Sequence, residues 1–573
     1  MHTSETPYVA LDRPASAPRC WRHVAAASCA VAVPSLLAIA LVVASSHLSL
    51  ALLAAPAPPL YTRCTLGRCD APPRVGTLRD DTAVVFVSAP SLATGANSSG
   101  PFLQRREVPF GSFYGLAQGD LSATVRPQDE RQQILGFGAA FTDAAADTLA
   151  RAPAPLQKQL LGELFGPHSI GYSLGRVPIA GTDFSPRAYT YDDGAADDVE
   201  LRRFNASADD VHRIPLLQKA LALEPELLLM ASPWSAPGWM KSNGGLVWGS
   251  LKPEHSKVWA KYFCRFLEHW ASRGVDFRWV AVQNEPSSNS RVSTLLSRLT
   301  IYWNSMSVTP EQVRDFIKDD LAPALGRCAK RTEILFHDDQ RSALPTYAAA
   351  VLGDPEAARH VAGAGVHWYD ASFLGSLLGW YWIDRQAEWS HVADFTQAWP
   401  NLTVLGTEAA EGFEPWSRGP KLGSWWRLET YAYDILRDLQ SGAHGWIDWN
   451  LLLAMDGGPN WAGNRCDAAL LLETNDKYPA IDGDAYTKQP MFYALAHFSA
   501  FVPRGSRRVA VESADFGADV PVVAFRTPSD TIVAVYLNRG ADDACLHLRD
   551  ARRRKALRFC APPHGLVTAV WRA

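Results

Sequence analysis

The chain has 573 residues, of which 47% are hydrophobic and 20% charged, close to the composition of a soluble globular protein. This composition excludes a disordered chain, a coiled coil and a multi-span membrane protein. Lysine and arginine (55) nearly balance aspartate and glutamate (59), so the formal charge of −4 excludes a protein that binds nucleic acid through its phosphates. Tryptophan is unusually frequent, with 20 residues against 17 tyrosines, which indicates a role beyond core packing.

An uncharged, nearly apolar run covers residues 24–55, behind a tail of residues 1–23 that contains three arginines from Arg13 onward. The excess of positive charge ahead of the run predicts a cytosolic tail and an exported remainder of the chain. The run is long enough to span a bilayer, and small residues near its end suit a signal peptidase. Residues 24–55 are therefore expected to be either an uncleaved signal anchor or a cleaved signal peptide.

Export predicts an oxidising compartment, and three glycosylation sequons agree with it, at Asn97, Asn205 and Asn401. The motif Tyr8-Val-Ala-Leu11 is similar to the tyrosine-based sorting signals of endolysosomal proteins. The alternative interpretation is four residues of a disordered tail. We expect the protein in the endolysosomal lumen or secreted, with an N-terminal membrane anchor if the signal is not cleaved.

Seven cysteines follow the apolar run. Cys64 and Cys69, five residues apart, could close a small loop, and Cys545 and Cys560 flank an apparent hairpin. No Cys-x-x-Cys or His-Glu-x-x-His spacing occurs, so no zinc site is predicted. The remaining three cysteines leave at least one thiol free or intermolecular: Cys264, Cys328 and Cys466.

Eight short apolar runs recur between about residues 133 and 451, and helical periodicity follows several of them. Continuous apolarity, rather than alternation, is typical of strands that are covered on both faces. The runs predict a (β/α)8 TIM barrel of the α/β class, with a doubly wound open sheet as the alternative. No Gly-x-Gly-x-x-Gly opens a helix, which disfavours nucleotide binding on an open sheet. The runs are Ile134–Ala140, Ile170–Ile179, Leu227–Ser232, Phe277–Val282, Glu333–Phe336, Gly365–Trp368, Val404–Thr407 and Gly445–Trp449.

Two β-rich segments flank these runs. Residues 61–130 contain the strand-like stretch Thr82–Ser88, and residues 481–573 contain four more such stretches, separated by turns rich in Gly, Asp and Pro. Strand runs at this spacing predict a sandwich or a small barrel. We therefore expect a catalytic barrel over residues 131–480 and one all-β sandwich domain built from both chain ends.

Polar and aromatic residues stand where the predicted strands end. In TIM barrels the carboxyl ends of the strands surround the active site. This rim would combine carboxylates, amides and indoles, a mixture that suits sugars, because hydroxyl groups take hydrogen bonds while their C–H faces stack on rings. Six tryptophans fall at or near the rim: Trp234, Trp239, Trp368, Trp446, Trp449 and Trp461.

Two glutamates end predicted strands four and seven. Glu285 lies between Asn284 and Pro286, and the proline is expected to push Glu285 into an extended conformation that aims its side chain into the barrel mouth. Glu408 is followed by two alanines that are too small to screen it. Such a pair can perform retaining glycoside hydrolysis if the carboxyl groups lie about 5–5.5 Å apart. The alternative is two ordinary strand-end glutamates, solvated or salt-bridged.

Longer motifs around these residues resemble glycoside hydrolase family 30, in particular its acid β-glucosidases. The resemblance runs from about residue 61 to the C-terminus, in order and with similar spacing, and includes the spacing of Cys64 and Cys69. The matching motifs are Gly136-Phe137-Gly138, Thr142-Asp143-Ala144-Ala145, Arg176-Val177-Pro178, Asp183-Phe184-Ser185, Ala231-Ser232-Pro233-Trp234, Asn284-Glu285-Pro286, Asp338-Asp339-Gln340-Arg341, His367-Trp368-Tyr369, Trp449-Asn450-Leu451, Gly457-Gly458-Pro459-Asn460-Trp461 and Lys488-Gln489-Pro490-Met491-Phe492-Tyr493.

The resemblance implies a retaining β-glucosidase that hydrolyses glucosylceramide without a cofactor or metal, with Glu285 as general acid/base and Glu408 as nucleophile. Glu285 must then be protonated while Glu408 is ionised, and loss of the Glu408 charge on glycosylation would lower the pKa of Glu285. The implied substrate-binding residues are Asp183, Trp234, Asn284, Tyr369, Trp449 and Asn464.

Several neighbouring residues are expected to support this pair. The resemblance implies that Arg176 and His367, together with Tyr369, orient and tune Glu408. The alternatives are a structural ion pair for Arg176 and a core histidine for His367. The carboxylates that we interpret as structural, capping a helix or pairing with Arg341, are Asp143, Asp338 and Asp339.

Two segments depart from the family. Ser287–Val308 is longer than the corresponding loop, and the family's aromatic residue at the mouth cannot be placed in it. Phe373–Ile383 is more apolar than expected and presents one helical stripe. That stripe either packs on a barrel strand or docks a membrane surface or a lipid-presenting activator protein. Rival functions are a different β-glycoside specificity, such as β-xylosidase or endo-β-1,6-glucanase, and a catalytically silent, membrane-anchored sugar-binding protein.

Overall fold

A computed structural model describes residues 59–94, 100–112, 120–194, 197–287, 303–369, 381–414, 417–473, 485–513, 520–553 and 555–573. The sequon at Asn97, most of the loop that follows Ser287 and most of the apolar stretch Phe373–Ile383 lie outside these residues. The apolar run at residues 24–55 also lies outside them. Within the described residues, no helix combines the length and the apolar character needed to cross a bilayer.

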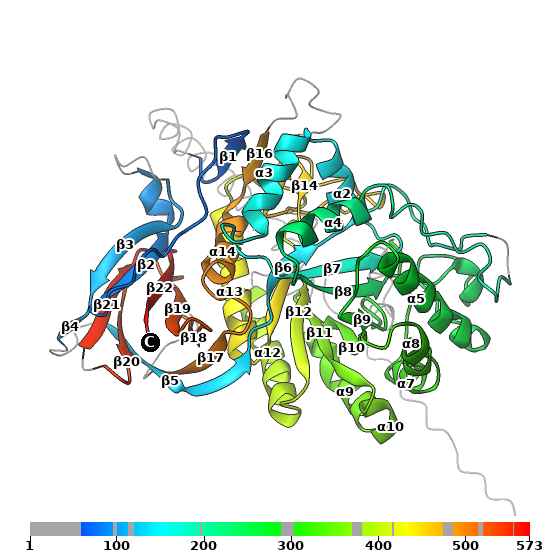
Figure 1. The fold of residues 1–573 in the computed structure, drawn as a ribbon. Helices are drawn as coiled ribbons and strands as arrows, with labels where there is room; N and C mark the ends of the chain where they lie inside the picture. The colour runs from blue at the N-terminus through cyan, green and yellow to red at the C-terminus, as the bar shows by residue number, and fades with distance from the viewer. Residues whose placement is uncertain are drawn as a thin grey trace, which may run out of the picture. The chain divides into compact units, whose positions relative to one another are not determined.

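Eight parallel strands close into a barrel in which each strand pairs with its neighbours in sequence, and the last, β13, pairs with the first, β6 (Figure 1). The predicted TIM barrel is thus confirmed. The strands are β6 (Gly136–Ala140), β7 (Leu174–Ile179), β8 (Leu228–Pro233), β9 (Trp279–Ala281), β10 (Glu333–Gln340), β11 (Val361–His367), β12 (Thr403–Glu408) and β13 (Gly445–Asp448).

The barrel interior is filled by large apolar side chains that point inward from six of the strands. These residues are Leu174, Met230, Trp279, Leu335, Leu405 and Ile447, together with Ala281, and all are buried. Every residue of β6, β7 and β12 after its first is also buried, which explains why these strands are largely apolar rather than alternating. The packed interior keeps the strands rigid and leaves only their carboxyl ends available for a site.

Helices connect the barrel strands, and short 3-10 and π turns extend several of them. Amphipathic α5 and α13 show why the chain is helical there, since apolar residues recur at three- and four-residue spacing and face the strands. The helices are α2 (Asp143–Ala150), α3 (Ala154–Leu164), α4 (Arg213–Leu223), α5 (Ser256–Ala271), α7 (Pro310–Phe316), α8 (Ala322–Cys328), α9 (Leu344–Leu352), α10 (Pro355–Ala358), α12 (Tyr381–Ala398), α13 (Trp425–Gln440) and α14 (Pro490–Ser499).

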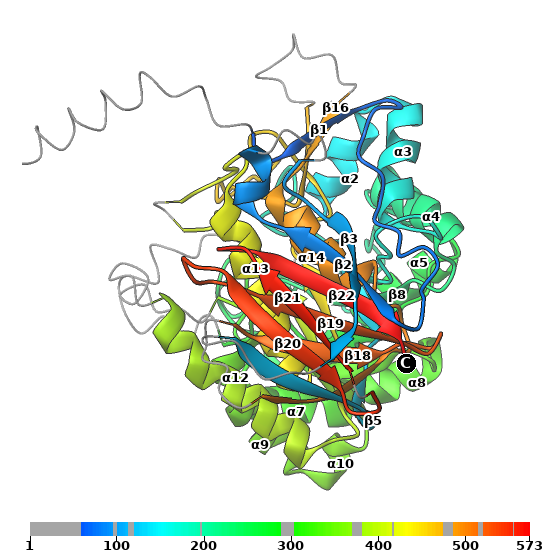
Figure 2. The same cartoon turned by 90° about the vertical axis from the view of Figure 1, so that its left-hand side faces the viewer.

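Both ends of the chain contribute to a ten-stranded sheet of the β domain (Figure 2). The strand order interleaves the two ends, so that β2 pairs with β22 and β5 lies between β17 and β20. In sheet order the strands are β3 (Gln104–Pro109), β2 (Thr82–Ser88), β22 (Leu566–Arg572), β19 (Thr531–Leu537), β18 (Val522–Arg526), β17 (Arg507–Ser513), β5 (Leu121–Gln133), β20 (Ala544–Asp550), β21 (Lys555–Ala561) and β4 (Gly111–Ser112).

Some residues expected in the β domain lie elsewhere. β1 (Thr62–Thr65) and β16 (Ala485–Lys488) pair with each other in a separate four-stranded sheet with β15 (Leu470–Leu472) and β14 (Leu453–Ala454). Helix α14, beyond the expected barrel boundary at residue 480, contacts both β6 and β22. It therefore joins the barrel to the β domain.

Three disulfides link the described cysteines. The two expected bonds, Cys64–Cys69 and Cys545–Cys560, are present. A third, Cys264–Cys328, joins α5 to α8 and was not predicted, because its partners are 64 residues apart and nothing in the local sequence connects them. Cys466 is the one free thiol among the described cysteines, and it is buried.

Candidate active site

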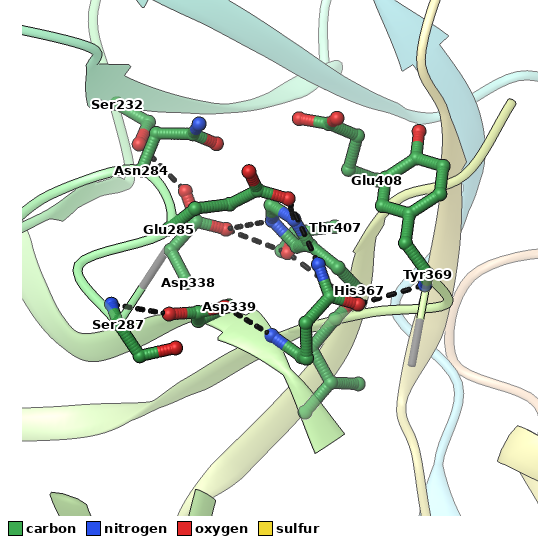
Figure 3. A network of polar contacts seen from close by, with 12 residues as sticks. Ser232, Asn284, Glu285, Ser287, Asp338, Asp339, His367, Tyr369, Thr407 and Glu408 are labelled. Atoms are coloured by element: carbon green, nitrogen blue, oxygen red, sulfur yellow. Dashed lines mark hydrogen bonds and ion pairs between the residues drawn. The ribbon is translucent and has the colours of Figure 1, made fainter. Parts of the chain in front are cut away.

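Glu285 and Glu408 face one another at the carboxyl end of the barrel (Figure 3). Glu408 is the last residue of β12, and Glu285 follows β9. An oxygen of each carboxyl group and a ring nitrogen of His367 all lie within 4.8 Å of one another. The side chain of Glu285 is 15% exposed and that of Glu408 9%, so both carboxyl groups are nearly desolvated yet open to the mouth.

The backbone of Glu285 is not extended as predicted, because its φ is +45°. The effect of Pro286 on the preceding residue is outweighed by tertiary contacts: the Glu285 N–H donates to the Asp338 carbonyl at 2.8 Å, and the Asn284 N–H to the Pro233 carbonyl at 2.9 Å. A non-glycine residue in this region costs about 1–3 kcal/mol, and such strain is commonly found at functional sites. Here the strained residue carries one of the two facing carboxyl groups.

Asp338 was expected to cap a helix or to pair with Arg341. It is instead the centre of a buried hydrogen-bond network. Its carboxylate accepts from Arg176 at 2.7 Å, Ser232 and Thr407 at 2.6 Å, and His367 at 3.1 Å. Although burial alone would raise the pKa of Asp338, the Arg176 charge and these hydrogen bonds hold it well below its usual range. Asp338 is therefore a permanent anion that organises the groups around the two glutamates.

Arg341 and the other carboxylates interpreted as structural have different partners. Arg341 binds Asp434 and Asp438 of α13, because β10 continues to Gln340 and directs the next residue outward. Asp339 accepts from the Ser287 and Gln340 backbone N–H groups at 2.7 Å. The remaining carboxylate, Asp143, pairs with Arg213 at 3.0 Å, and Thr142 rather than Asp143 caps α2.

Arg176 links Asp338 to Glu408 and to Asn284. One guanidinium nitrogen donates to Glu408, and another donates to Asn284 Oδ1 and to Asp338, each at 2.7 Å. The guanidinium also lies over the Trp234 ring, 4.7 Å from its centroid. Arg176 is fully buried. It thus holds one oxygen of Glu408 and the Asn284 amide oxygen, which leaves the NH2 group of Asn284 pointing away from this contact.

His367 hydrogen-bonds Glu285 rather than Glu408. Its Nδ1 lies 3.2 Å from Glu285 Oε1 and its Nε2 lies 3.1 Å from Asp338. Burial alone would lower the pKa of His367, but the charge of Glu408 and the hydrogen bonds to Asp338 and Glu285 raise it to about 10. His367 is therefore an imidazolium that donates from both nitrogens, and its positive charge lies between the carboxyl groups of Glu285 and Asp338.

We expect the raised pKa of His367 to make stability pH-dependent. The stabilisation is complete below the unfolded pKa of about 6.5 and is lost as the pH rises toward 10, because the unfolded chain then releases the proton that the folded state retains. The free energy of unfolding should therefore fall, relative to that of His367→Gln, by several kcal/mol between pH 6 and 10. Urea unfolding of both proteins across this range measures the difference, and parallel curves would contradict it.

The environment of Glu285 favours its protonated form. Burial raises its pKa, and the negative charges of Glu408 and Asp339 add to this effect, while the hydrogen bond and charge of His367 oppose it. Burial raises the pKa of the Tyr369 phenol, and the negative charges of nearby Glu408 and Glu285 raise it further. The carboxyl groups of Glu285 and Glu408 thus lie close together but have different surroundings (Figure 3).

Four of the expected sugar-binding residues form a wall beside Glu408. They are Asp183, Trp234, Trp449 and Asn464. Trp234 and Trp449 stack with their centroids 5.0 Å apart and an interplanar angle of 20°. Asp183 accepts from Asn464 at 2.8 Å, and burial raises the pKa of Asp183 to about 7. Asn460, which the sequence did not single out individually, also faces Asp183, at 3.5 Å. The wall therefore offers both rings and hydrogen-bonding groups.

Two aromatic residues missed by sequence reasoning adjoin this wall. Trp303 packs partly buried against the cluster that contains Trp234 and Trp449. Phe413 packs on Tyr369 at 4.9 Å. Trp303 lies 18 residues after Glu285 and Phe413 lies five residues after Glu408, and no local pattern distinguishes either from a core aromatic residue.

Two tryptophans expected near the rim lie behind the strands instead. Trp368 and Trp446 are buried and pack edge-on against Tyr431 of α13, at 5.2 and 5.3 Å. The Trp446 indole N–H donates to Asp434 at 3.0 Å. Side chains on a strand alternate between its two faces, so residues next to rim positions point into the helical layer.

The two described sequons are compatible with glycosylation. Asn205 and Asn401 are exposed, the former in the loop before α4 and the latter before β12. Modification at these residues remains a prediction.

Known proteins share both domains of this chain. The glycosyl hydrolase family 30 TIM-barrel domain matches residues 134–502, and the family's β-sandwich domain matches residues 505–569. The chain belongs to glycoside hydrolase family 30. Its members include the lysosomal acid glucosylceramidase of Mus musculus, which is 36% identical over 85% of this chain and 90% of its own length. The resemblance inferred from the motifs is thereby confirmed, and the protein is a glycosidase.

The chain is also similar to proteins that are not named as glucosylceramidases. An endo-1,6-β-D-glucanase of Trichoderma harzianum is 28% identical over 76% of this chain and 83% of its own length. Among solved structures, SrfJ from Salmonella typhimurium superposes with a TM-score of 0.73 at 28% identity, covering 86% of this chain and 100% of its own. The family therefore determines the fold and the general reaction, but it includes more than one substrate specificity.

Proposed function

We propose that this glycosidase is a retaining β-glucosidase that hydrolyses glucosylceramide to glucose and ceramide. The observation that carries the proposal is the separation of at most 4.8 Å between carboxylate oxygens of Glu285 and Glu408. Retaining enzymes place their carboxyl groups about 5–5.5 Å apart, whereas inverting enzymes separate them by about 6.5–9.5 Å to admit a water molecule. The observed separation is close to the retaining value and well below the inverting one.

In the first step, Glu408 attacks the anomeric carbon while Glu285 transfers its proton to the glycosidic oxygen. The C1–O bond breaks, ceramide leaves as an alcohol, and a glucosyl ester forms on Glu408. Arg176 donates a hydrogen bond to one oxygen of Glu408, and the other oxygen is directed toward the sugar. The free NH2 group of Asn284 meets the 2-hydroxyl, where hydrogen bonding strengthens in the transition state.

In the second step, Glu285 accepts a proton from water as the water oxygen attacks the same carbon. Glucose is released and both carboxyl groups return to their starting states. Esterification removes the charge of Glu408, one of the causes that raise the pKa of Glu285, so Glu285 becomes a better anion when it must act as a base. The same carboxyl group therefore acts as acid and then as base.

Glucose specificity is supported by the wall beside Glu408. Asp183 and Asn464 meet hydroxyl groups at the 3-, 4- and 6-position side, and the stacked pair Trp234 and Trp449 borders the sugar. The 36% identity to a glucosylceramidase, against 28% to a β-1,6-glucanase, favours the lipid-linked substrate. We further propose a lysosomal or secreted location and action at a lipid surface, in line with the name of that relative.

A 2-deoxy-2-fluoro β-glucoside with an activated leaving group tests the mechanism, because it traps the glucosyl ester. We expect peptide mass spectrometry to find the label on Glu408 and nowhere else. A label on a peptide without Glu408 would contradict the nucleophile, and inverted product stereochemistry would contradict retention. Glucose release from glucosylceramide, compared with xylosides and β-1,6-glucan under the same conditions, tests the substrate, and faster hydrolysis of either competitor would contradict it.

A further inference from the structure

Gln340 is a buried amide between the general acid/base and the rim of the site. It is the last residue of β10, and its Nε2 donates to Glu285 Oε1 at 2.8 Å. Its Oε1 accepts from the backbone N–H of Tyr369 at 2.7 Å. One side chain therefore connects the ends of three barrel strands, β9, β10 and β11.

The orientation of this amide is fixed by its partners. A backbone N–H can only donate, so the group that faces Tyr369 must be the amide oxygen, and the NH2 group must face Glu285. The Gln340 backbone N–H donates to Asp339 at 2.7 Å, and the next residue, Arg341, is anchored to α13 through Asp434. Gln340 is held from both sides and cannot exchange its donor for its acceptor.

Both donors that reach Glu285 bind the same oxygen. His367 Nδ1 lies 3.2 Å from Oε1, the atom that also accepts from Gln340, while no described residue donates to Oε2. We propose that Gln340 is a positioning residue that, together with His367, confines the catalytic proton of Glu285 to Oε2. The proposal rests on the acid/base role of Glu285 given above.

The consequence is a fixed direction of proton transfer. An oxygen that accepts two hydrogen bonds has no room for its own proton, so the O–H bond forms on Oε2, the Glu285 oxygen to which no described residue donates. In the first step the Oε2–H bond breaks as the leaving-group oxygen takes the proton. In the second step a water O–H bond breaks and its proton returns to Oε2. The charged groups that face Glu285 throughout are His367, Glu408, Asp338 and Asp339.

The variants Gln340→Met and Gln340→Glu both remove the NH2 donor, and the second keeps an acceptor for the Tyr369 N–H. We expect kcat/KM for an alkyl β-glucoside, whose leaving group needs a proton, to fall about 10–100-fold in both variants. For 2,4-dinitrophenyl β-glucoside, which leaves without protonation, kcat/KM should fall less than 3-fold. An equal loss on both substrates, or no loss on either, would overturn the proposal.

The pH profile provides a second measurement that a purely structural role would not move. A hydrogen bond to the ionised carboxylate favours that form, so its removal raises the pKa of Glu285. The alkaline limb of kcat/KM for the alkyl glucoside should therefore shift to higher pH in both variants, and an unmoved limb would contradict the proposal. Gln440→Met is the matched control, because its amide binds the Val522 carbonyl far from the site. It should change neither measurement.

Glu285→Gln separates this proposal from the one on which it rests. If Glu285 is the acid/base, its variant loses activity on the alkyl glucoside far more than on the dinitrophenyl glucoside, and added azide restores turnover of the latter as glucosyl azide. A variant without this pattern would overturn the role of Glu285 itself. With the pattern present, normal behaviour of both Gln340 variants would overturn only the role of Gln340.

Discussion

The variant Glu408→Gln is expected to lose at least about 10⁴-fold in kcat on any β-glucoside, because the amide cannot form the glucosyl ester. The loss should persist with activated leaving groups, since acid assistance does not replace a nucleophile. Folding should remain intact, because glutamine still accepts the hydrogen bond from Arg176 and fills the same volume. Steady-state kinetics with an aryl glucoside measures the change, and circular dichroism measures the fold.

The matched control is Glu333→Gln. Glu333 is the first residue of β10, at the opposite end of the barrel, where it pairs with exposed Arg278 at 2.9 Å. Its variant should retain wild-type kinetics. Comparable activity of the Glu408 and Glu333 variants would exclude Glu408 as the nucleophile.

The variant Arg176→Met is expected to lower the free energy of unfolding by about 3–5 kcal/mol, because it leaves Asp338 and Glu408 as buried charges without their counter-ion. The methionine also gives up the cation–π contact with Trp234. Urea denaturation followed by tryptophan fluorescence measures the loss, and activity should fall with it because Glu408 and Asn284 lose their common donor.

Arg278→Met provides the comparison for this loss. The Arg278 side chain is 49% exposed and its partner Glu333 38%, so their pair should contribute at most about 1 kcal/mol. If the two arginine variants were equally stable, the Arg176 cluster would not be the stabilising centre inferred from its burial.

The barrel and the facing pair of glutamates were predictable because both follow local rules. Continuous apolar runs identified all eight strands, and the rule that function lies at the carboxyl ends directed attention to Glu285 and Glu408. Disulfides between near neighbours, such as Cys64–Cys69, were also visible in the spacing.

The remaining features depend on contacts between distant residues. The backbone of Glu285 departs from the preference set by Pro286 because Asp338 binds its N–H group. Strand β10 continues for four residues beyond its apolar run. This extension places Asp338 at the centre of the network and directs Arg341 toward α13. Such effects arise when strands meet, so the sequence of one strand does not contain them.

The interleaving of both chain ends in the ten-stranded sheet also determines when this protein can finish folding. Val84 of β2 pairs with Val570 of β22, across nearly the whole chain. At a synthesis rate of about 5–20 residues per second, β2 waits on the order of 25–100 s for its partner. Until then the apolar strands β2 and β19 each present an unpaired edge, and a chain that stops before Leu566 never covers them. Short truncations at the C-terminus should therefore cause aggregation, although they lie outside the catalytic barrel.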